Sequence, residues 1–405
     1  MIIKMAWRNL WRNKRRTLIT AASLYFAIVF AIIMRSMQLG TYDLMIDSAV
    51  KTYSGFIQIC DSTYWEDKSI DDMFVFDRDF EQMAGSVAGV LSVLPRLETF
   101  SLVSSGSKTK GVVIQGIDPV KDDAMTGMSK HLISGSYITR NGRNVVLSSR
   151  LAAFLGVSAG DTVVMLSQGY HGISAADKYR VCGIVKVPVP TLDNKLVIMP
   201  LSLVQDFVSA PQMVTSVAIN IESRRHMDNI AATLKKKLAN SNLRVLKWTE
   251  MNKVLKQQIE SDNSSGIIML GILYMVIFFG ILGTIIMMTG ERMREFGVIT
   301  ALGMRRTKIV FMMFAETVFI GLLGLLAGAL TTVPLIAWYS QNPIHLTGEM
   351  AKAYEAYGIE PMMGFSTDPM IVINQFYTVL ILMMITLIYP LFKIGKLNII
   401  NALRG

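Results

Sequence analysis

The chain has 405 residues, 52% of them hydrophobic, and a mean hydropathy of +0.42. This composition excludes an ordinary soluble protein and indicates several membrane spans together with a soluble portion. The net charge of +10 suggests a nucleic-acid partner, but the basic excess lies in three short segments beside apolar runs. The one region large enough to bind nucleic acid is nearly neutral, so we expect no nucleic-acid partner.

The first predicted element is an amphipathic helix over residues 1–17. Its apolar positions at helical spacing are Ile3, Ala6, Trp7, Leu10 and Trp11, and basic residues surround them. Tryptophan and basic side chains suit a helix that lies on the inner leaflet, which makes membrane lipids a partner. The alternative interpretation is a plain basic anchor in front of a span.

Four apolar runs are long enough to cross a bilayer, which takes about 20 residues. They predict membrane-spanning helices at 18–40, 264–289, 309–339 and 369–392. The third run is overlong, which favours a tilt or a kink near Pro334.

The distribution of Lys and Arg orients these spans, because basic residues favour cytoplasmic loops. Basic residues exceed acidic ones in 1–17, 290–308 and 393–405. We therefore expect both termini and the middle loop in the cytoplasm. Residues 41–263 and the loop 340–368 lack this excess and are expected on the outer side.

Residues 41–263 have the mixed pattern of a large α+β extracytoplasmic domain inserted between the first two spans. Alternating apolar residues predict strands at 56–60, 112–116, 162–166, 179–185, 196–199 and 216–221. Helices are expected near 148–156, 201–209, 227–240 and 249–262. A helical pattern also continues the first span to Ala49, and a short polar break at 262–265 precedes the second span. Two helical stalks are therefore expected to link the domain to the spans.

The loop 290–308 combines basic residues with a helical pattern. The residues spaced three or four apart are Phe296, Ile299, Thr300 and Leu302, and Gly303 stands where a helix C-cap is expected. Arg305 and Arg306 follow, close to a helix C-terminus that favours cations. A short helix here fits docking by a cytoplasmic partner. A basic loop that only fixes topology fits the residue pattern equally well.

The run Glu-Arg-Met-Arg-Glu-Phe-Gly-Val-Ile-Thr-Ala-Leu-Gly-Met from Glu291 to Met304 resembles the signature of FtsX-like permeases. These are the membrane subunits of the ABC transporter class that includes MacB exporters and Lol lipoprotein-releasing permeases. In that family the stretch is the coupling helix, which docks into a groove on the ATPase subunit. The resemblance implies ATPase contacts from Glu291, Arg292, Glu295, Phe296, Gly297, Ile299, Leu302 and Gly303.

Weaker resemblances extend to other parts of the chain. The segment Trp-Arg-Asn-Leu-Trp-Arg-Asn-Lys-Arg-Arg-Thr from Trp7 resembles the start of the family's permeases, and the closing Ala402-Leu-Arg404 resembles their terminal pattern. Asp118-Pro119 and the stretch 155–161 are similar to the outer domain of MacB-like and Lol-type permeases. The resemblance implies a central subdomain near 105–212, with the flanking portions forming a second one.

The third predicted span contains an acid and three glycines. Glu316 lies about 10 Å inside the span at the helical rise, where a carboxylate must face protein or water. We interpret it as a structural hydrogen-bonding group; proton transport is the alternative. Arg35 lies near the opposite surface, so the two are not expected to pair. Gly324 and Gly328 form a GxxxG pair, and Gly321 precedes it on the helix, a pattern that allows close helix packing.

The sequence contains no pattern for catalysis. It has no Walker A motif, no nucleophile elbow and no HExxH motif, so we expect a non-catalytic subunit whose ATPase is a separate chain. The His residues at 131, 171, 226 and 345 show no metal-ligand spacing, and neither a metal nor a cofactor is expected. Cys60 and Cys182 both fall in the outer domain, where a disulfide is permitted but not required.

Among the families resembled, an outer domain of this size without a fused ATPase is most similar to the Lol type. The resemblance implies a permease that pairs with a second permease, identical or not, and releases lipoproteins from the outer leaflet to a periplasmic carrier. It also implies a bacterial inner membrane as the location and an acyl-chain cavity between the first and second spans of the paired permeases, with Met34, Met37, Ile268 and Ile272 as candidate wall residues. Alternatives are a MacB-like exporter of small molecules or peptides, an FtsX-like regulator of a cell-wall hydrolase, and a membrane-anchored sensor.

The resemblance generates a first prediction. Substituting Phe296 or Gly297 is expected to uncouple ATP hydrolysis from transport while the protein stays folded, because the coupling helix transmits the motion. The measurement is ATPase activity against transport in the reconstituted complex. Intact coupling in a Gly297→Arg variant contradicts the assignment.

Overall fold

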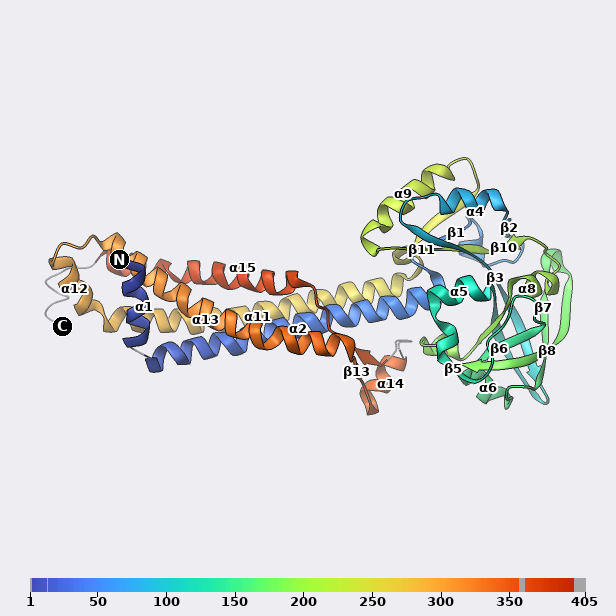
Figure 1. Ribbon diagram of the computed structural model, residues 1–405, viewed down its shortest axis with the longest axis horizontal. Helices are drawn as coiled ribbons and strands as arrows, with labels where there is room; N and C mark the ends of the chain where they lie inside the picture. The colour runs from blue at the N-terminus through green and yellow to red at the C-terminus, as the bar shows by residue number, and fades with distance from the viewer. Residues whose placement is uncertain (1, 13, 357–360, 397–405) are drawn as a thin grey trace. The chain divides into compact units, whose positions relative to one another are not determined.

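The computed structural model describes residues 2–12, 14–356 and 361–396 (Figure 1). The chain divides into two compact units. The membrane unit comprises Met1–Asp43, Gln258–His345 and Met362–Gly405, and the α+β unit comprises Leu44–Gln257 and Leu346–Pro361.

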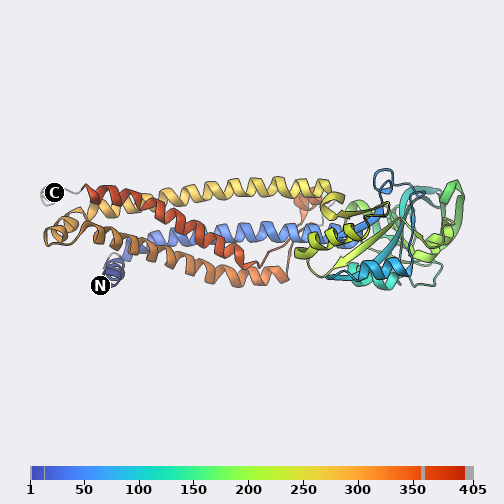
Figure 2. The same cartoon turned by 90° about the horizontal axis from the view of Figure 1, so that it is seen from above.

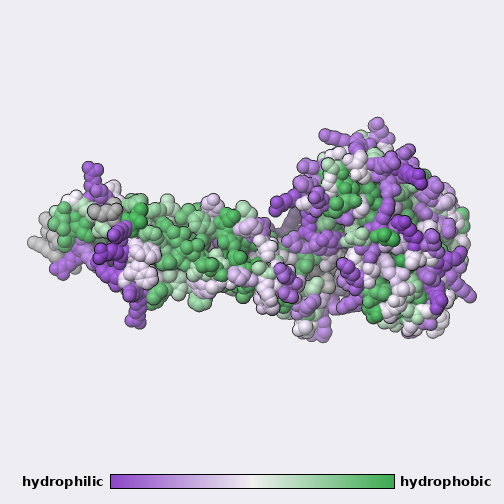
Figure 3. Space-filling model, in the orientation of Figure 1, coloured by the Kyte–Doolittle hydropathy of each residue, from purple (hydrophilic) through white to green (hydrophobic). Residues whose placement is uncertain are grey.

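The membrane unit is built from four long apolar helices, which confirms the expected number of spans. They are α2 (Lys14–Ala49), α11 (Lys253–Glu291), α13 (Arg306–Gln341) and α15 (Pro369–Thr386), the last continued by α16 (Ile388–Gly395). Figures 1 and 2 show these helices running side by side. Ile28, Ile281, Ile320 and Val379, one from each helix, are buried in a common core. Much of the remaining apolar surface faces outward, as Figure 3 shows in green, which suits a lipid environment.

The GxxxG pair brings α13 against α2. A Cβ added to Gly324 would lie 2.9 Å from Leu24 Cβ and 3.2 Å from the Ala21 carbonyl oxygen. A Cβ on Gly328 would lie 3.1 Å from Ile28 Cγ2. This pair therefore allows α2 and α13 to approach closely within one chain. A Cβ on Gly321 would instead collide with the flexible end of Met383 on α15.

Polar side chains join α2 and α11 along the same unit. Tyr42 donates a hydrogen bond of 2.5 Å to Asp262, and Arg35 donates one of 2.8 Å to Asn263. Gln38 also donates to the Asp262 carboxylate. The expected break at 262–265 is wrong, because α11 is continuous there. Its polar residues read as a loop in the sequence, yet partners on α2 satisfy them inside a helix.

The α+β unit contains a ten-stranded sheet in the order β12-β1-β11-β3-β4-β9-β6-β8-β5, with β7 paired to β3 and β8. The strands of this sheet are β1 (Ile57–Asp61), β3 (Val90–Ser105), β4 (Lys108–Ile117), β5 (Leu132–Gly135), β6 (Asn144–Ser148), β7 (Thr162–Gln168), β8 (Ser174–Val185), β9 (Leu196–Pro200), β11 (Ser216–Ile221) and β12 (Leu243–Lys247). A separate two-stranded sheet pairs β2 (Phe74–Val75) with β10 (Met213–Val214). All six predicted strands are confirmed.

Helices complete this unit. They are α3 (Tyr64–Asp67), α4 (Arg78–Gly85), α5 (Pro119–Thr126), α6 (Ser149–Leu155), α7 (Pro190–Asp193), α8 (Leu201–Phe207), α9 (Met227–Lys237), α10 (Trp248–Met251) and α14 (Gly348–Ala356). The predicted helices near 148–156, 201–209 and 227–240 correspond to α6, α8 and α9. The segment 340–368 also holds a β-hairpin of β13 (Ile344–His345) and β14 (Met362–Met363) in the membrane unit, and neither this hairpin nor α14 was expected.

Strand β3 connects two hydrophobic cores within the α+β unit. Its first part pairs with β11 up to Arg96, and its second part pairs with β4 from Leu97 onward. One core lies around β1 and β11 beneath α4 and α9, and the other around β4 and β9 beneath α6 and α8. The change of core therefore falls within β3, earlier than residue 105. Cys60 in β1 and Cys182 in β8 are both free thiols.

The glycine contact generates a prediction for stability. Replacing Gly324 by Ala is expected to lower the free energy of unfolding by about 1–3 kcal/mol, because the new methyl group overpacks the α2–α13 contact. Thermal unfolding of the full chain in mild detergent measures this. Gly280→Ala on α11 is the matched control, since nothing lies within 4 Å of its added Cβ. Equal unfolding temperatures for the two variants contradict the assignment.

Candidate functional site

The expected helix in the loop 290–308 is present as α12 (Met293–Ala301). It follows α11 after a turn at Arg292 and ends at Leu302 and Gly303. Gly303 has a φ of +95°, its N–H donates to the Thr300 carbonyl at 3.0 Å, and the Met304 N–H donates to the Ile299 carbonyl at 3.2 Å. These two bonds define a Schellman motif, which requires a left-handed residue. The predicted role of Gly303 as a helix stop is confirmed.

One face of α12 is anchored inside the membrane unit. The Phe296 side chain is fully buried in a cluster with Ala6, Ile309, Met312 and Ile394. These residues come from α1 (Ile2–Arg12), α13 and α16, so three elements hold the helix in place. Ile299 and Met304 pack against the same cluster.

This burial changes the expected role of three residues. The resemblance implies partner contacts from Phe296, Gly297 and Arg292, but all three are buried against the rest of the chain. Substituting Phe296 therefore tests how α12 is anchored as well as what α12 binds.

The opposite face of α12 carries exposed apolar side chains. Leu302 is 82% exposed and Val298 is 44% exposed, and both are large apolar side chains. The other exposed residues of the segment are Glu291, Arg294, Glu295, Ala301 and Gly303. Apolar side chains rimmed by charged ones are the pattern of a protein-contact surface.

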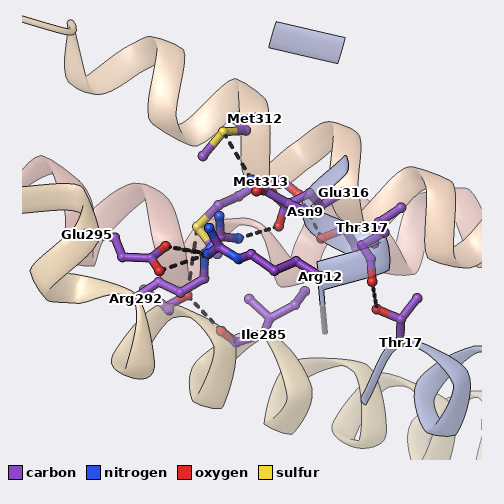
Figure 4. Close-up of polar contacts among 12 residues, drawn as sticks. Asn9, Arg12, Thr17, Ile285, Arg292, Glu295, Met312, Met313, Glu316 and Thr317 are labelled. Atoms are coloured by element: carbon purple, nitrogen blue, oxygen red, sulfur yellow. Dashed lines mark hydrogen bonds and ion pairs between the residues drawn. The ribbon is translucent and has the colours of Figure 1, made fainter. Parts of the chain in front are cut away.

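A network of polar contacts lies beneath α12 and connects it to α1 and α13 (Figure 4). Glu316 on α13 accepts hydrogen bonds from Arg292 at 2.6 Å and from Asn9 at 2.8 Å. Arg292 also donates to Glu295 at 3.3 Å. Both oxygens of Glu295 accept from Arg12 at 2.8 Å. Glu316 thus makes the hydrogen bonds to neighbouring elements that the sequence analysis expected.

The two ion pairs of this network differ in burial. The side chains of Glu316 and Arg292 are 1% and 8% exposed, so each neutralises the charge of the other in a poorly solvated site. Arg12 and Glu295 are 54% and 46% exposed, and water screens their attraction. Partial burial acts to raise the pKa of Glu295, but the hydrogen bonds and charges of Arg12 and Arg292 outweigh it and lower that pKa.

Asn9, Arg12 and the pairing of Arg292 with Glu316 were not anticipated. The spacing of residues around the Gly303 turn could have indicated the pairing of Arg292 with Glu316. Arg292 precedes and Glu316 follows the Gly303 turn by similar numbers of residues, so the two come to the same depth on facing helices. Asn9 lies one residue before the buried Leu10 on an amphipathic helix, and this position could have indicated that its side chain is near the inner face.

The candidate cavity residues differ in exposure within this chain. Ile268 and Ile272 lie on the exposed side of α11, 66% and 60% accessible, whereas Met37 packs against the membrane-unit core. Met34 is half-buried on α2. Two small cavities in this unit, of about 20 and about 10 Å³, are lined by other side chains, including Leu322 and Thr284.

Comparisons with known proteins match nearly the whole chain. The family "FtsX-like permease C-terminal" matches residues 267–399, which include α12 and Glu316, and the family "MacB-like periplasmic core domain" matches residues 17–237. The lipoprotein-releasing system transmembrane protein LolC of Xylella fastidiosa strain 9a5c is 22% identical over 328 residues, which cover 78% of each chain. LolC of strain Temecula1 matches to the same extent.

Two solved structures are also similar. The extracellular domain of the noncanonic ABC-type transporter YknZ from Gram-positive bacteria is 14% identical, with a TM-score of 0.34, and covers 47% of this chain and 99% of that chain. The periplasmic region of MacB from Actinobacillus actinomycetemcomitans is 16% identical, with a TM-score of 0.36, and covers 52% and 94%.

The buried ion pair generates a prediction. Glu316→Ala is expected to lower the free energy of unfolding by about 3–5 kcal/mol, because it removes the buried carboxylate that neutralises the Arg292 guanidinium and leaves only the longer contact to the half-exposed Glu295. Denaturation of the full chain in mild detergent measures this loss.

Two control variants make the result specific. Glu295→Gln weakens the exposed pair and should cost about 1 kcal/mol or less. The double replacement Arg292→Met with Glu316→Met removes both charges and should recover most of the stability. A Glu316→Ala variant as stable as Glu295→Gln refutes the role of the buried pair.

Proposed function

The chain belongs to the FtsX-like permeases with a MacB-like periplasmic core domain, and we propose that it couples a separate ATPase to lipoprotein release. It is an ABC transporter permease of the FtsX/MacB type in a bacterial inner membrane. Members of this family work with an ABC ATPase partner. The proposal concerns how this chain engages that partner and what the complex transports.

The exposed face of α12 is the observation that carries the proposal. Leu302 and Val298 offer an apolar contact, and Arg294 and Glu295 offer charged ones at its rim. Water-exposed leucine on a short helix gains free energy when a groove covers it. Lys and Arg in the segments that adjoin α12 favour the cytoplasm, where an ATPase has access to ATP.

The buried face gives α12 the anchorage that force transmission needs. Phe296 is packed among three elements, and Arg292 is bonded to Glu316 on α13. A push on Leu302 would therefore move α12 together with α1 and the start of α13. A loop without this anchorage would yield locally instead.

Lipoprotein release is the finer part of the proposal. It is supported by the likeness to LolC proteins over 78% of the chain and by the outward apolar side chains of α11, among them Ile268 and Ile272. In a complex of two permeases such side chains suit contact with acyl chains. We therefore propose an acylated protein as substrate, a second permease subunit as partner, and a periplasmic carrier as acceptor.

A MacB-like exporter of small molecules or peptides is the second candidate. The match of residues 17–237 to the MacB-like periplasmic core domain favours it. The two candidates differ in cargo and share the same use of α12.

The exposed leucine generates a prediction for ATPase binding. Leu302→Asp is expected to reduce the amount of ATPase that copurifies with the full chain about tenfold or more, because it places a charge in an apolar contact. Leu91→Asp, a 64% exposed leucine in β3, is the matched control and should leave copurification unchanged. Equal recovery of the ATPase with both variants argues against docking at α12.

The proposed acylated-protein substrate leads to a separate prediction. Affinity purification of the wild-type chain in mild detergent, followed by mass spectrometry, is expected to recover acylated proteins together with an ATPase that carries a Walker A motif. Recovery of the ATPase with a periplasmic adaptor or hydrolase, and without acylated proteins, would replace lipoprotein release by one of the alternatives.

A further inference from the structure

The N-terminal helix α1 has a face that the membrane unit does not use. Its inner face is occupied, since Ala6 and Leu10 are buried and Asn9 bonds Glu316 on α13. The exposed residues between Ile3 and Arg12 form two stripes along the helix, each with a spacing of four. One stripe is apolar and the other is basic.

The apolar stripe consists of Ile3, Trp7 and Trp11, which are 59%, 42% and 48% exposed. The two indole rings pack edge to face with their centroids 6.1 Å apart. The Trp7 ring also packs against Phe319 of α13, with a centroid distance of 5.4 Å. The rings are therefore held in place while a large part of each remains uncovered. Tryptophan held at a helix surface in this way suits the headgroup level of a bilayer.

The basic stripe consists of Lys4, Arg8 and Arg12, and α1 contains no acidic residue. Within the described part of the chain, Lys4 and Arg8 form no ion pair, and both are exposed. Lys14 and Arg15 extend the positive charge into the start of α2. Figure 3 shows hydrophilic side chains at this end of the membrane unit, next to the apolar surface of the helices.

Adjacent basic and aromatic stripes fit an anionic membrane surface better than a protein or a free anion. A free phosphate would use the cations and leave the indole rings in water. Acyl chains and headgroups together cover both stripes at once. Charge complementarity then selects lipids with a net negative headgroup over zwitterionic ones.

Arg12 belongs to the basic stripe and to the site at α12 at the same time. Its guanidinium donates to both oxygens of Glu295, and about half of its side chain remains accessible. An exposed pair of this kind is weak and easily opened. Binding of α1 to the membrane surface would therefore also keep Arg12 in the position where it pairs with Glu295.

We propose that α1 binds anionic phospholipid headgroups through Lys4 and Arg8, and that the Arg12–Glu295 pair passes this binding on to α12. In an anionic membrane α12 is then held more firmly than in a neutral one. Lipid charge thereby regulates the surface that the proposed function assigns to the ATPase. That regulatory consequence rests on the proposed function, whereas lipid binding and its effect on α12 do not.

The test uses the purified full chain without any ATPase. Native mass spectrometry in mild detergent, with graded phosphatidylglycerol or phosphatidylcholine, gives the apparent affinity for each lipid. Phosphatidylglycerol is expected to bind more tightly. The Lys4→Gln/Arg8→Gln variant should lose on the order of 25-fold in that affinity, and little for phosphatidylcholine.

Lys235→Gln/Lys236→Gln is the matched control, because it removes the same charge from exposed positions on α9 in the α+β unit. It should bind phosphatidylglycerol as the wild type does. Equal affinity of the wild type for both lipids, or an equal loss in both double variants, overturns the lipid site.

Hydrogen exchange in nanodiscs tests the link to α12. Amides of residues 293–304 should exchange several-fold more slowly in an equal mixture of the two lipids than in phosphatidylcholine alone. Glu295→Gln should abolish this difference while phosphatidylglycerol still binds, which separates transmission from binding. A difference that persists in Glu295→Gln, or that is absent in the wild type, overturns the proposed link. Failure of ATPase docking at Leu302 would leave all these results unaffected.

Discussion

A carboxylate inside an apolar helix bundle must be neutralised, and the geometry at one end of the membrane unit follows from that requirement. Glu316 is 1% exposed and bonds Arg292 and Asn9. Because Asn9 lies on α1 and Arg292 lies at the turn before α12, satisfying this one acid brings both elements to the same place on α13. The cost of leaving any of these charges unpaired is what makes the arrangement specific. The Phe296 cluster then packs around it.

This arrangement divides α12 into two faces with different tasks. The inner face, with Phe296 and Gly297, is committed to the rest of the chain, and the outer face, with Leu302 and Val298, is open. A helix that used all of its apolar residues to bind a partner would have no apolar contact with the rest of its own chain, and it could not transmit the partner's motion. The Schellman motif at Gly303 keeps the two faces distinct, because it ends the helix at a defined residue and turns the chain into α13.

Local patterns predicted the parts of the fold that depend on local physics. The spans follow from run length, the strands from alternation, and the stop at Gly303 from the freedom of glycine to adopt a positive φ. The sequence did not predict strand β3, because Pro95 and several serines interrupt the apolar alternation. Hydrogen-bonded partner strands on both sides stabilise it in the sheet. The continuity of α11 was missed because Asp262 and Asn263 look like a loop until Tyr42 and Arg35 are placed beside them. The family resemblance located α12 but not its orientation, and Phe296 lies on the face that is buried within this chain.

The central claim is that a partner ATPase docks on the exposed face of α12. Photo-crosslinking tests it most directly, with a photoreactive amino acid at Val298 or Leu302, and at Trp338 near the other end of α13 as the comparison position, 61% exposed. The account predicts crosslinks to a protein with a Walker A motif from positions 298 and 302 and none from 338. No such crosslink from α12, or equal crosslinking from all three positions, would contradict it.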